Sequence, residues 1–480
     1  MPDLESEQIP ALVETIHFIA ICGTGMGALA CMLKKMGYKI SGSDQNIYPP
    51  ISDFLNQQNI VVSRGFSPGH LAHNPDLVIV GNAVSKENPE VREMISKGLK
   101  FCSMPQAINR FVAKKKRKLV ITGTHGKTTT AAILTWILFT AGLDPSYIIG
   151  GILTDFNSNY RLGKGNYIII EGDEYDTAFF DKGAKFMHYN PFAAILTSVE
   201  FDHADIFVDL DHVKQTFADF INKIEPDSGL MIFDNDGNIS EVIKGAKCHI
   251  AKYGKASDSS WILDKVDIKG AYTIFSVLKH GEPYGQFKTS LIGTHNLYNA
   301  LACIGVADQL GISKEFIRQA LLTFGGVWRR QQIRGVKNDI IIMDDFAHHP
   351  TAVRETISAV KSFYKGKRLV AVFEPRTNSS MQDIFQHVYP LCFDQADLIC
   401  IRKPPLLKKI PPGKRLSAEK LVADIQKRGK NAHYFNDTGD IIQFLLKTAL
   451  PGDVILIMSN GGFDNIHTRL LNKLENYYNQ

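Results

Sequence analysis

The hydrophobic pattern near the start of the chain predicts a strand, a glycine turn, a helix and a second strand. Residues 16–22 read IHFIAIC, a continuous apolar run typical of a buried parallel strand. The turn GTGMG follows, then a helical pattern from Ala28 to Met36, then a strand that ends at SGSD. The run DLVIV over 76–80 is a further candidate for a buried strand. This order is that of a parallel β-α-β unit.

The same alternation recurs twice along the chain. After the basic run AKKKRK (113–118), LVIT leads into GTHGKTTT and the apolar helix pattern AAILTWILFTA, and the runs YIIIE and AAILT continue the series. After GGVWRR (325–330), the apolar runs IIIMDD, RLVAVFEP, LICI and DVILIMS alternate with helical stretches. The sequence therefore predicts an α/β protein of three domains, each an open, mostly parallel sheet with flanking helices, over residues 1–113, 114–327 and 328–480.

Composition and charge narrow the class of protein. A length of 480 residues suits about three domains. With 54 basic and 49 acidic residues the net charge is only +5, and AKKKRK is more typical of a solvated hinge than of a nucleic-acid patch, so we expect no nucleic-acid partner. The seven cysteines form no CxxC pair, and the polar start MPDLESEQIP is no signal peptide. No apolar run spans a membrane, and we expect a reducing cytoplasm.

The sharpest chemical signal is the loop GTHGKT at 123–128, between a strand and a helix. Glycines let backbone N–H groups approach phosphate oxygens, and the helix N-terminus and Lys127 supply positive charge. The hydroxyl of Thr128 is placed to hold Mg²⁺. Ile121 stands where the full eight-residue P-loop pattern has glycine, so the loop is a shortened form. The pattern predicts phosphate binding; the alternative is a glycine turn with a solvated lysine.

Two acidic segments follow the next predicted strands. EGDE begins at Glu171, and EFDH ends at His203. The carboxyl ends of parallel strands gather at one edge, where ligands collect in open α/β sheets. Mg²⁺ prefers oxygen ligands. Glu171 and His203 are therefore candidate metal ligands, against the alternative of a solvated acidic surface.

The first glycine loop is a weaker signal. Gly23, Gly25 and Gly27 follow the first strand, and Asp44 ends the next strand about 20 residues on, where a ribose-binding carboxylate is expected. Ala28 stands at the last position of the pattern. The loop predicts a pyrophosphate site, either of a nicotinamide dehydrogenase or, beside a second nucleotide loop, of a nucleotide-linked substrate.

Three further segments follow predicted strands or open helices. Asn296 in GTHN is placed to read a base edge or to cap a helix. Arg329 and Arg330 are adjacent, so we expect them not to be equally buried; one of them is placed to bind a γ-phosphate across a domain gap, and the alternative is a surface pair. The run DDFAHHP (344–350) predicts the wall of a site.

Taken together, GTHGKTTT, EGDE, EFDH, GTHNLYNA, WRR and DDFAHHP, in this order, resemble the Mur ligase family over essentially the whole chain. The resemblance implies a Rossmann-like N-terminal domain that binds a UDP-linked substrate, a central P-loop ATPase domain and a Rossmann-like C-terminal ligase domain. It implies a reaction that uses ATP and Mg²⁺ to join an amino acid or peptide to a UDP-linked muramic acid through an acyl phosphate.

Within the family, the first glycine loop and DDFAHHP resemble the branch that acts on UDP-N-acetylmuramate itself. Four segments resemble the ligase of this branch that joins the recycled tripeptide L-alanyl-γ-D-glutamyl-meso-diaminopimelate to UDP-N-acetylmuramate. They are GSDQNIYPP (42–50), EGDEYDTAFFDKGAKFMHYNP (171–191), FEPRTNSSM (373–381) and MSNGGFDNIH (458–467). The alternative within the branch is the ligase that adds L-alanine in de novo peptidoglycan synthesis. Outside the family, the alternatives are a nicotinamide oxidoreductase, a nucleic-acid ATPase and a non-catalytic nucleotide-binding module. We expect a monomer or a weak homodimer that needs no membrane.

The resemblance implies a role for each matching residue. The catalytic set is Lys127, His203, Arg330 and His348. ATP is bound by Gly123, Thr124, His125, Gly126, Lys127, Thr128, Thr129, Asn296, Arg330 and Asp345. One Mg²⁺ is held by Thr128 and Glu171, and His203 helps to hold a second. The substrates are bound by Gly23, Gly25, Gly27, Asp44 and Asn82 on the UDP side, and by Arg376, whose planar fork suits a peptide carboxylate.

Two departures from the family pattern carry expectations of their own. Ser198 stands where relatives usually have asparagine before the ExDH motif, which puts a side-chain contact there in doubt. Several members use a carbamylated lysine near the second metal; Lys214 is out of register for it.

Overall fold

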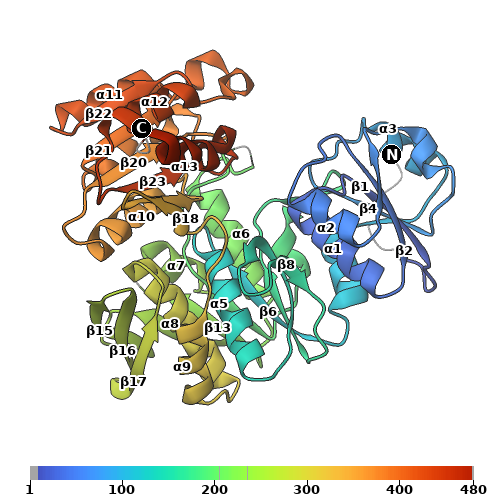
Figure 1. The fold of residues 1–480 in the computed structure, drawn as a ribbon. Helices are drawn as coiled ribbons and strands as arrows, with labels where there is room; N and C mark the ends of the chain where they lie inside the picture. The colour runs from blue at the N-terminus through green and yellow to red at the C-terminus, as the bar shows by residue number, and fades with distance from the viewer. Residues whose placement is uncertain (1–8, 205, 235, 478–480) are drawn as a thin grey trace.

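The computed structural model describes residues 9–204, 206–234 and 236–477. Within them, three separate sheets carry their own helices, in chain order from blue to red (Figure 1). The N-terminal sheet lies to one side of the central sheet, and the C-terminal sheet lies above it in that view. The predicted α/β class with three mostly parallel sheets is confirmed.

The N-terminal sheet is parallel, with the order β3-β2-β1-β4-β5. Its strands are β1 (Thr15–Ile19), β2 (Lys39–Asp44), β3 (Val61–Arg64), β4 (Leu77–Val80) and β5 (Phe101–Ser103). Its helices are α1 (Thr24–Lys35), α2 (Ile51–Gln57), α3 (Pro89–Ser96) and α4 (Met104–Ala107). Helix α1 begins inside the glycine run, earlier than the apolar pattern predicts, because Gly25 and Gly27 are themselves helical.

The central sheet has the order β17-β16-β15-β14-β13-β12-β6-β9-β7-β8. Its strands are β6 (Arg117–Thr122), β7 (Ser146–Leu153), β8 (Ser158–Arg161), β9 (Tyr167–Glu171), β12 (Ala193–Leu196), β13 (Gly229–Phe233), β14 (His249–Gly254), β15 (Trp261–Lys269), β16 (Tyr272–Lys279) and β17 (Glu282–Thr289). The middle of the sheet is parallel, whereas β15–β17 form an antiparallel extension that the apolar runs do not predict. A separate hairpin pairs β10 (Asp176–Ala178) with β11 (Asp181–Ala184).

Two helices form the centre of this domain. Its helices are α5 (Lys127–Thr140), α6 (Leu210–Asn222), α7 (Gly237–Val242), α8 (Thr294–Gln309) and α9 (Lys314–Thr323). Helices α5 and α8 pack on each other and are apolar around most of their circumference, so most of their residues are buried. This burial fixes the start of α5, and with it the P-loop, relative to the sheet.

The C-terminal sheet has the order β18-β19-β23-β20-β21-β22, parallel except for the antiparallel edge strand β18. Its strands are β18 (Gln332–Lys337), β19 (Ile340–Asp345), β20 (Leu369–Phe373), β21 (Leu398–Arg402), β22 (Ala432–Phe435) and β23 (Val454–Met458). Its helices are α10 (Pro350–Phe363), α11 (Ala418–Lys427), α12 (Thr438–Thr448) and α13 (Ile466–Tyr477).

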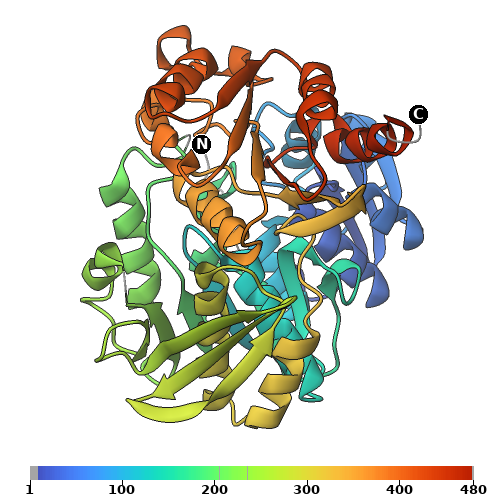
Figure 2. The ribbon, with the colours of Figure 1, turned by 60° about the vertical axis from the view of Figure 1, so that its left-hand side comes forward.

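Close contacts join the central domain to its neighbours. Asn159 at the start of β8 donates a side-chain hydrogen bond to the carbonyl of Thr24 in the first glycine loop, at 3.1 Å. Gly293 (φ +91°) lies so close to α10 that a Cβ there would overlap the side chain of Ala359. Figure 2 shows the C-terminal domain sitting over the central sheet. The two outer domains therefore both contact the domain that carries the P-loop.

Two expectations about the chain as a whole can be compared with this structure. All seven cysteines are buried and unpaired, as their apolar surroundings predict. Among the described residues, no helix has the length and the apolar character needed to cross a membrane.

Candidate functional site

Three predicted segments meet at the carboxyl edge of the central sheet. In the parallel ladder Ile121 pairs with Glu171 and Leu196 pairs with Thr122, so β6, β9 and β12 end side by side. The loop after β6 is shaped by glycine: Gly123 has φ +123° and Gly126 has φ +80°. A Cβ at Gly126 would lie 2.7 Å from the side-chain oxygen of Asn299. The shortened loop therefore has the strand–turn–helix context of a phosphate cradle.

Lys127 is the first residue of α5, and its side chain folds back onto the loop that precedes the helix. Its Nζ donates to the carbonyl of Gly123 at 2.6 Å and lies 2.8 Å from Oε2 of Glu174, which is 4% exposed. Burial lowers the pKa of Lys127, but the hydrogen bond and charge of Glu174 together with the charges of Glu171 and Asp173 outweigh burial, and the net pKa is raised. The lysine is therefore charged at neutral pH, as a phosphate partner requires.

Thr128 and Glu171 form an oxygen pair beside this lysine. The Thr128 hydroxyl donates to Oε1 of Glu171 at 2.8 Å, and the Gly150 N–H donates to Oε2 at 2.5 Å. A hydroxyl and a carboxylate at this separation are hard oxygen donors, which suit Mg²⁺. The residues present fit the predicted ion.

His203 lies next to a different carboxylate. Its Nε2 is 3.2 Å from Oε1 of Glu174, and its backbone is left-handed at φ +53°. Burial lowers the pKa of His203, whereas its hydrogen bond to Glu174 raises it, and the net shift is upward. Of the three predicted metal residues, the structure thus pairs Thr128 with Glu171 and pairs His203 with Glu174. Glu174, which joins Lys127 to His203, is a residue that the sequence reasoning did not single out.

The linker WRRQ places both arginines at the site. Arg329 has φ +60° and donates to the carbonyls of Ser459 and Gly461 at 2.5 and 2.7 Å. Arg330 lies with Nη2 3.5 Å from the Thr128 hydroxyl and with its guanidinium over the Phe346 ring. Both side chains are half-buried, and the left-handed turn at Arg329 directs each toward a different partner, so Arg330 rather than Arg329 approaches the Thr128 hydroxyl.

The predicted adenosine residues gather around the same linker. Oδ2 of Asp345 accepts from the N–H of Gln331 at 2.8 Å, and Oδ1 accepts from that of Ala347 at 2.7 Å. Asn296, near the start of α8, donates to Oε1 of Gln331 at 3.1 Å and to the carbonyl of Ile292 at 2.9 Å. These contacts bring Asn296, Asp345 and Arg330 together.

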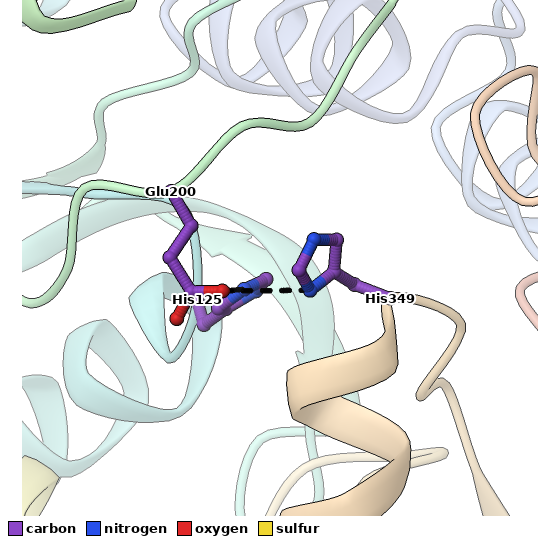
Figure 3. A group of neighbouring side chains, drawn as sticks. All are labelled: His125, Glu200 and His349. Atoms are coloured by element: carbon purple, nitrogen blue, oxygen red, sulfur yellow. Dashed lines mark ion pairs between the residues drawn. The ribbon is translucent and has the colours of Figure 1, made fainter. Parts of the chain in front are cut away.

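The EFDH segment contacts the DDFAHHP loop across the domain boundary. His348 Nε2 lies 3.7 Å from Oδ2 of Asp202, and the Ala204 N–H donates to the Ser379 hydroxyl at 3.2 Å. His125, from the P-loop, has its ring 4.6 Å from that of His349 (Figure 3). Its side chain thus faces the C-terminal domain, while its backbone N–H donates to Oγ of Ser198.

Ser198 takes part in closing the P-loop. Its hydroxyl accepts from the N–H of His125 at 2.9 Å, and its carbonyl accepts from the N–H of Thr124 at 3.0 Å. A side-chain contact therefore exists at this position, although serine replaces the usual asparagine. Lys214 pairs with Glu241 at 2.9 Å on the surface of α6 and α7, consistent with its exclusion as a metal-site lysine.

The first glycine loop is closed by tight packing. A Cβ at Gly25 would lie 2.8 Å from Sδ of Met104, and one at Gly27 would overlap Ile51. Asp44 accepts from the N–H of Cys22 at 2.8 Å and so braces the start of the loop. Asn82 lies on a cavity of 340 Å³, whose other lining residues include Val84, Lys86, Phe179 and Lys182. The cavity thus lies between the N-terminal domain and the hairpin β10–β11.

Arg376 follows β20 in the C-terminal domain. Its Nη1 lies 3.6 Å from Oε1 of Glu374, which is fully buried, and its side chain packs against the backbone of Gly461. The guanidinium is partly exposed and oriented by these contacts. The position is compatible with the predicted carboxylate partner.

Three family models match the chain, and each covers the region of one of the three sheets. Residues 15–116 match the Mur ligase family catalytic domain, residues 121–307 the Mur ligase middle domain, and residues 329–461 the glutamate ligase domain of Mur ligases. The chain is 38% identical over 462 residues to the UDP-N-acetylmuramate–L-alanyl-γ-D-glutamyl-meso-2,6-diaminoheptandioate ligase of Haemophilus influenzae, covering 96% of this chain and 99% of that one.

A second sequence relative and a solved structure are also similar to this chain over nearly its whole length. The chain is 34% identical over 465 residues to the UDP-N-acetylmuramate–L-alanine ligase of Geotalea uraniireducens, covering 96% of this chain and 98% of that one. A crystal structure of a murein peptide ligase from Psychrobacter arcticus superposes with a TM-score of 0.71 at 34% identity, covering 96% and 99% of the two chains. With all three domain models matched in order and nearly full-length relatives above 30% identity, the chain belongs to the Mur ligase family.

Proposed function

We propose that this protein is an ATP-dependent, ADP-forming ligase that joins the tripeptide L-alanyl-γ-D-glutamyl-meso-diaminopimelate to UDP-N-acetylmuramate in peptidoglycan recycling. The observation that carries the ligase chemistry is one cluster of side chains: Lys127 and Arg330 flank the Thr128–Glu171 oxygen pair, with Nη2 of Arg330 3.5 Å from the Thr128 hydroxyl. Two cations beside a metal-type oxygen pair suit a site where a carboxylate meets a triphosphate.

In this proposal the lactyl carboxylate of UDP-N-acetylmuramate attacks the γ-phosphorus of ATP and gives an acyl phosphate and ADP. The α-amine of the tripeptide then attacks the acyl carbon, and phosphate leaves from the tetrahedral intermediate and takes up the proton that the nitrogen loses. Mg²⁺, when bound at Thr128 and Glu171, neutralises phosphate charge. Lys127 and Arg330 hold the phosphoryl group in line, and His203 and His348 border the reacting centre. The protein contributes chiefly positioning and charge neutralisation.

The choice of tripeptide over L-alanine is supported by sequence similarity and by one residue. Identity is 38% to the tripeptide ligase of Haemophilus influenzae and 34% to the L-alanine ligase of Geotalea uraniireducens. Arg376, oriented by the buried Glu374, offers a bidentate partner for a peptide carboxylate. Addition of L-alanine is the second candidate, because both kinds of relative match the chain almost end to end.

The test is a product assay on the full chain. The protein is incubated with ATP, Mg²⁺, UDP-N-acetylmuramate and either L-alanine or the tripeptide, and the products are weighed by mass spectrometry. We expect the tripeptide adduct and one ADP per adduct. An L-alanine adduct alone would establish the second candidate instead. Binding of NAD(P) in a fluorescence titration, or stimulation of ATP hydrolysis by DNA or RNA, would contradict both.

The remaining parts of the proposal concern organisation. We place the domain boundaries at 113/114 and 327/328, near the gaps between the three sheets. We place the reaction in the cytoplasm, which suits seven unpaired buried cysteines. The site roles assigned above, and a monomer or weak homodimer as the assembly, belong to the same proposal.

A further inference from the structure

A P-loop residue and two residues to which the ligase chemistry above gives no role meet at the boundary of two domains. His125 from the P-loop and Glu200 from the EFDH segment face His349, the residue before α10 (Figure 3). Nε2 of His125 lies 3.5 Å from Oε2 of Glu200, and Nδ1 of His349 lies 3.7 Å from the same oxygen. Each residue thus offers one donor atom, and these atoms all lie within 4.8 Å of one another.

The hydrogen bonds around the cluster identify which lone pairs are available. Nε2 of His349 lies 3.2 Å from the carbonyl of Phe201, so this nitrogen carries the proton and Nδ1 has the lone pair. The single lone pair of Nδ1 accepts the Thr351 N–H at 3.3 Å, the cap of α10, so an ion bound at Nδ1 would displace this hydrogen bond. The Thr351 hydroxyl donates to Glu200 at 2.7 Å. Nε2 of His125 is buried and has no hydrogen-bond partner.

An unpartnered buried nitrogen needs an explanation, because buried polar atoms almost always have a partner. We propose that His125, Glu200 and His349 form a site for a divalent transition-metal ion of the zinc class, distinct from the Mg²⁺ of the ligase reaction. Two imidazoles and one carboxylate are a frequent donor set for Zn²⁺ with a fourth position left open, whereas Mg²⁺ takes oxygen ligands.

The spacing of the donors agrees with this assignment. Bonds of about 2.1 Å in a tetrahedral site place neighbouring donor atoms roughly 3.4 Å apart. Two of the three separations, 3.5 and 3.7 Å, are already near that value. The third separation, which is within 4.8 Å, closes by a small rotation of the two imidazole rings about their Cβ bonds.

The site also joins two domains. His125 and Glu200 belong to the central domain, and His349 belongs to the C-terminal domain. An ion bound to all three would hold the domains in the arrangement described here. The consequence for turnover rests on the proposed function: if the C-terminal domain must open to release products, a bound ion slows the ligase.

The test measures binding of zinc chloride to the full-length protein by competition with a chromophoric chelator, in the presence of excess Mg²⁺. We expect one Zn²⁺ per chain, with affinity lowered at least tenfold in His349→Asn and in Glu200→Gln. Asparagine retains the capping role of His349 toward the Thr351 N–H, and glutamine retains an acceptor for the Thr351 hydroxyl, so both variants should fold. His280→Asn, on the exposed turn between β16 and β17, is the matched control and should bind like the wild type.

A second readout is independent of activity. Co²⁺ in place of Zn²⁺ should give the intense visible absorption of a four-coordinate site in the wild type and in His280→Asn only. Equal Zn²⁺ affinity in all four proteins, or a Co²⁺ spectrum that is the same in all of them, would mean an adventitious ion only and would overturn the proposal. A failed product assay in metal-free protein would instead bear on the proposed ligase reaction.

Discussion

Two clusters of the same composition lie in different parts of this protein and differ in how tightly they are built. In the N-terminal domain, Glu90 is fully buried between histidines: Nδ1 of His70 lies 2.6 Å from Oε1, and Nε2 of His17 lies 3.5 Å from Oε2. The Ser43 hydroxyl donates to the same carboxylate at 2.5 Å, and the Ser67 N–H donates at 3.1 Å.

The cluster around Glu200 has the same carboxylate and two histidines but fewer short bonds. The Glu200 side chain is 33% exposed, its histidine nitrogens stand 3.5 and 3.7 Å away, and its short hydrogen bond comes from Thr351. The difference follows from location. Glu90 lies within one domain and its carboxylate has hydrogen-bond contacts of 2.5, 2.6 and 3.1 Å, although Nε2 of His17, like Nε2 of His125, has no hydrogen-bond partner. Glu200 lies between two domains, and its carboxylate has one short hydrogen bond, from Thr351. A ligand site needs donor and acceptor groups that are not already fully bonded, whereas a core does not.

The largest expected effect comes from removing Glu90, which tests whether its cluster stabilises the N-terminal domain. We expect Glu90→Ala to lower the free energy of unfolding by about 3–5 kcal/mol. The variant leaves the Ser43 hydroxyl, the Ser67 N–H and the ring nitrogens of His17 and His70 without their acceptor. Glu93→Ala, on the same helix and paired with Lys97 at 3.4 Å, is the control and should cost less than about 1 kcal/mol. Urea unfolding followed by circular dichroism measures both. A Glu90→Ala loss as small as that of the control would show that the cluster does not stabilise the domain.

The second test concerns the site side of the comparison. We expect Lys127→Ala to lose about 10²–10³-fold in kcat/KM for ligation, equivalent to about 3–4 kcal/mol in the barrier, while remaining folded. Glu174 keeps His203 as a partner at 3.2 Å in this variant. Lys447→Ala, on the exposed face of α12, is the matched control. Near-normal turnover of Lys127→Ala would refute the assigned role.

A third histidine environment is that of His295, which lies near the charge of Arg330. Nδ1 of His295, at the start of α8, is buried without a partner, and burial together with the charge of Arg330 lowers the pKa of His295 to about 4. A histidine with a lowered folded-state pKa binds fewer protons than it does in the unfolded chain below pH 6.5. Its contribution therefore destabilises the fold progressively as the pH falls from about 6.5 to 4.

We expect about 1–2 kcal/mol of stability to be lost through His295 between pH 7.5 and 5. His295→Gln should reduce that loss. The measurement is the urea midpoint of tryptophan fluorescence at the two pH values, since Trp136 and Trp261 both report on the central domain. An unchanged difference between the two midpoints in His295→Gln would assign the acid sensitivity to other groups.

The sequence predicts the parts of the site that are local and misses those that depend on how domains meet. The P-loop follows β6 directly, and Glu171 and Asp345 are the last residues of β9 and β19, so a strand pattern places each at the carboxyl end of a strand. Glu174 and His349 were inside recognised motifs, but their neighbours were singled out instead, because burial and the left-handed turn at His203 are not visible in a hydrophobic pattern. The antiparallel strands β15–β17 were missed because their residues alternate between buried and exposed rather than forming apolar runs.

The smallest expected effect tests whether Arg376 belongs to the site or to the core. Its neighbour Glu374 is fully buried, like Glu90, and is bonded by Arg402 and by the Ser459 hydroxyl, so Glu374 does not depend on Arg376 for charge compensation. The Arg376 guanidinium, partly exposed and 3.6 Å from Glu374, is therefore free to pair with an incoming carboxylate. We expect Arg376→Ala to raise KM for the tripeptide about tenfold, equivalent to about 1.4 kcal/mol, with KM for UDP-N-acetylmuramate and the urea midpoint unchanged.

Arg376→Lys retains the charge but not the planar fork, so it should restore only part of the tripeptide affinity. A raised KM for both substrates, or a lowered urea midpoint, would assign Arg376 to the structure of the C-terminal domain. In that case Arg376 would be a structural partner of Glu374, and the Glu374 cluster would resemble the buried cluster around Glu90 rather than the one around Glu200.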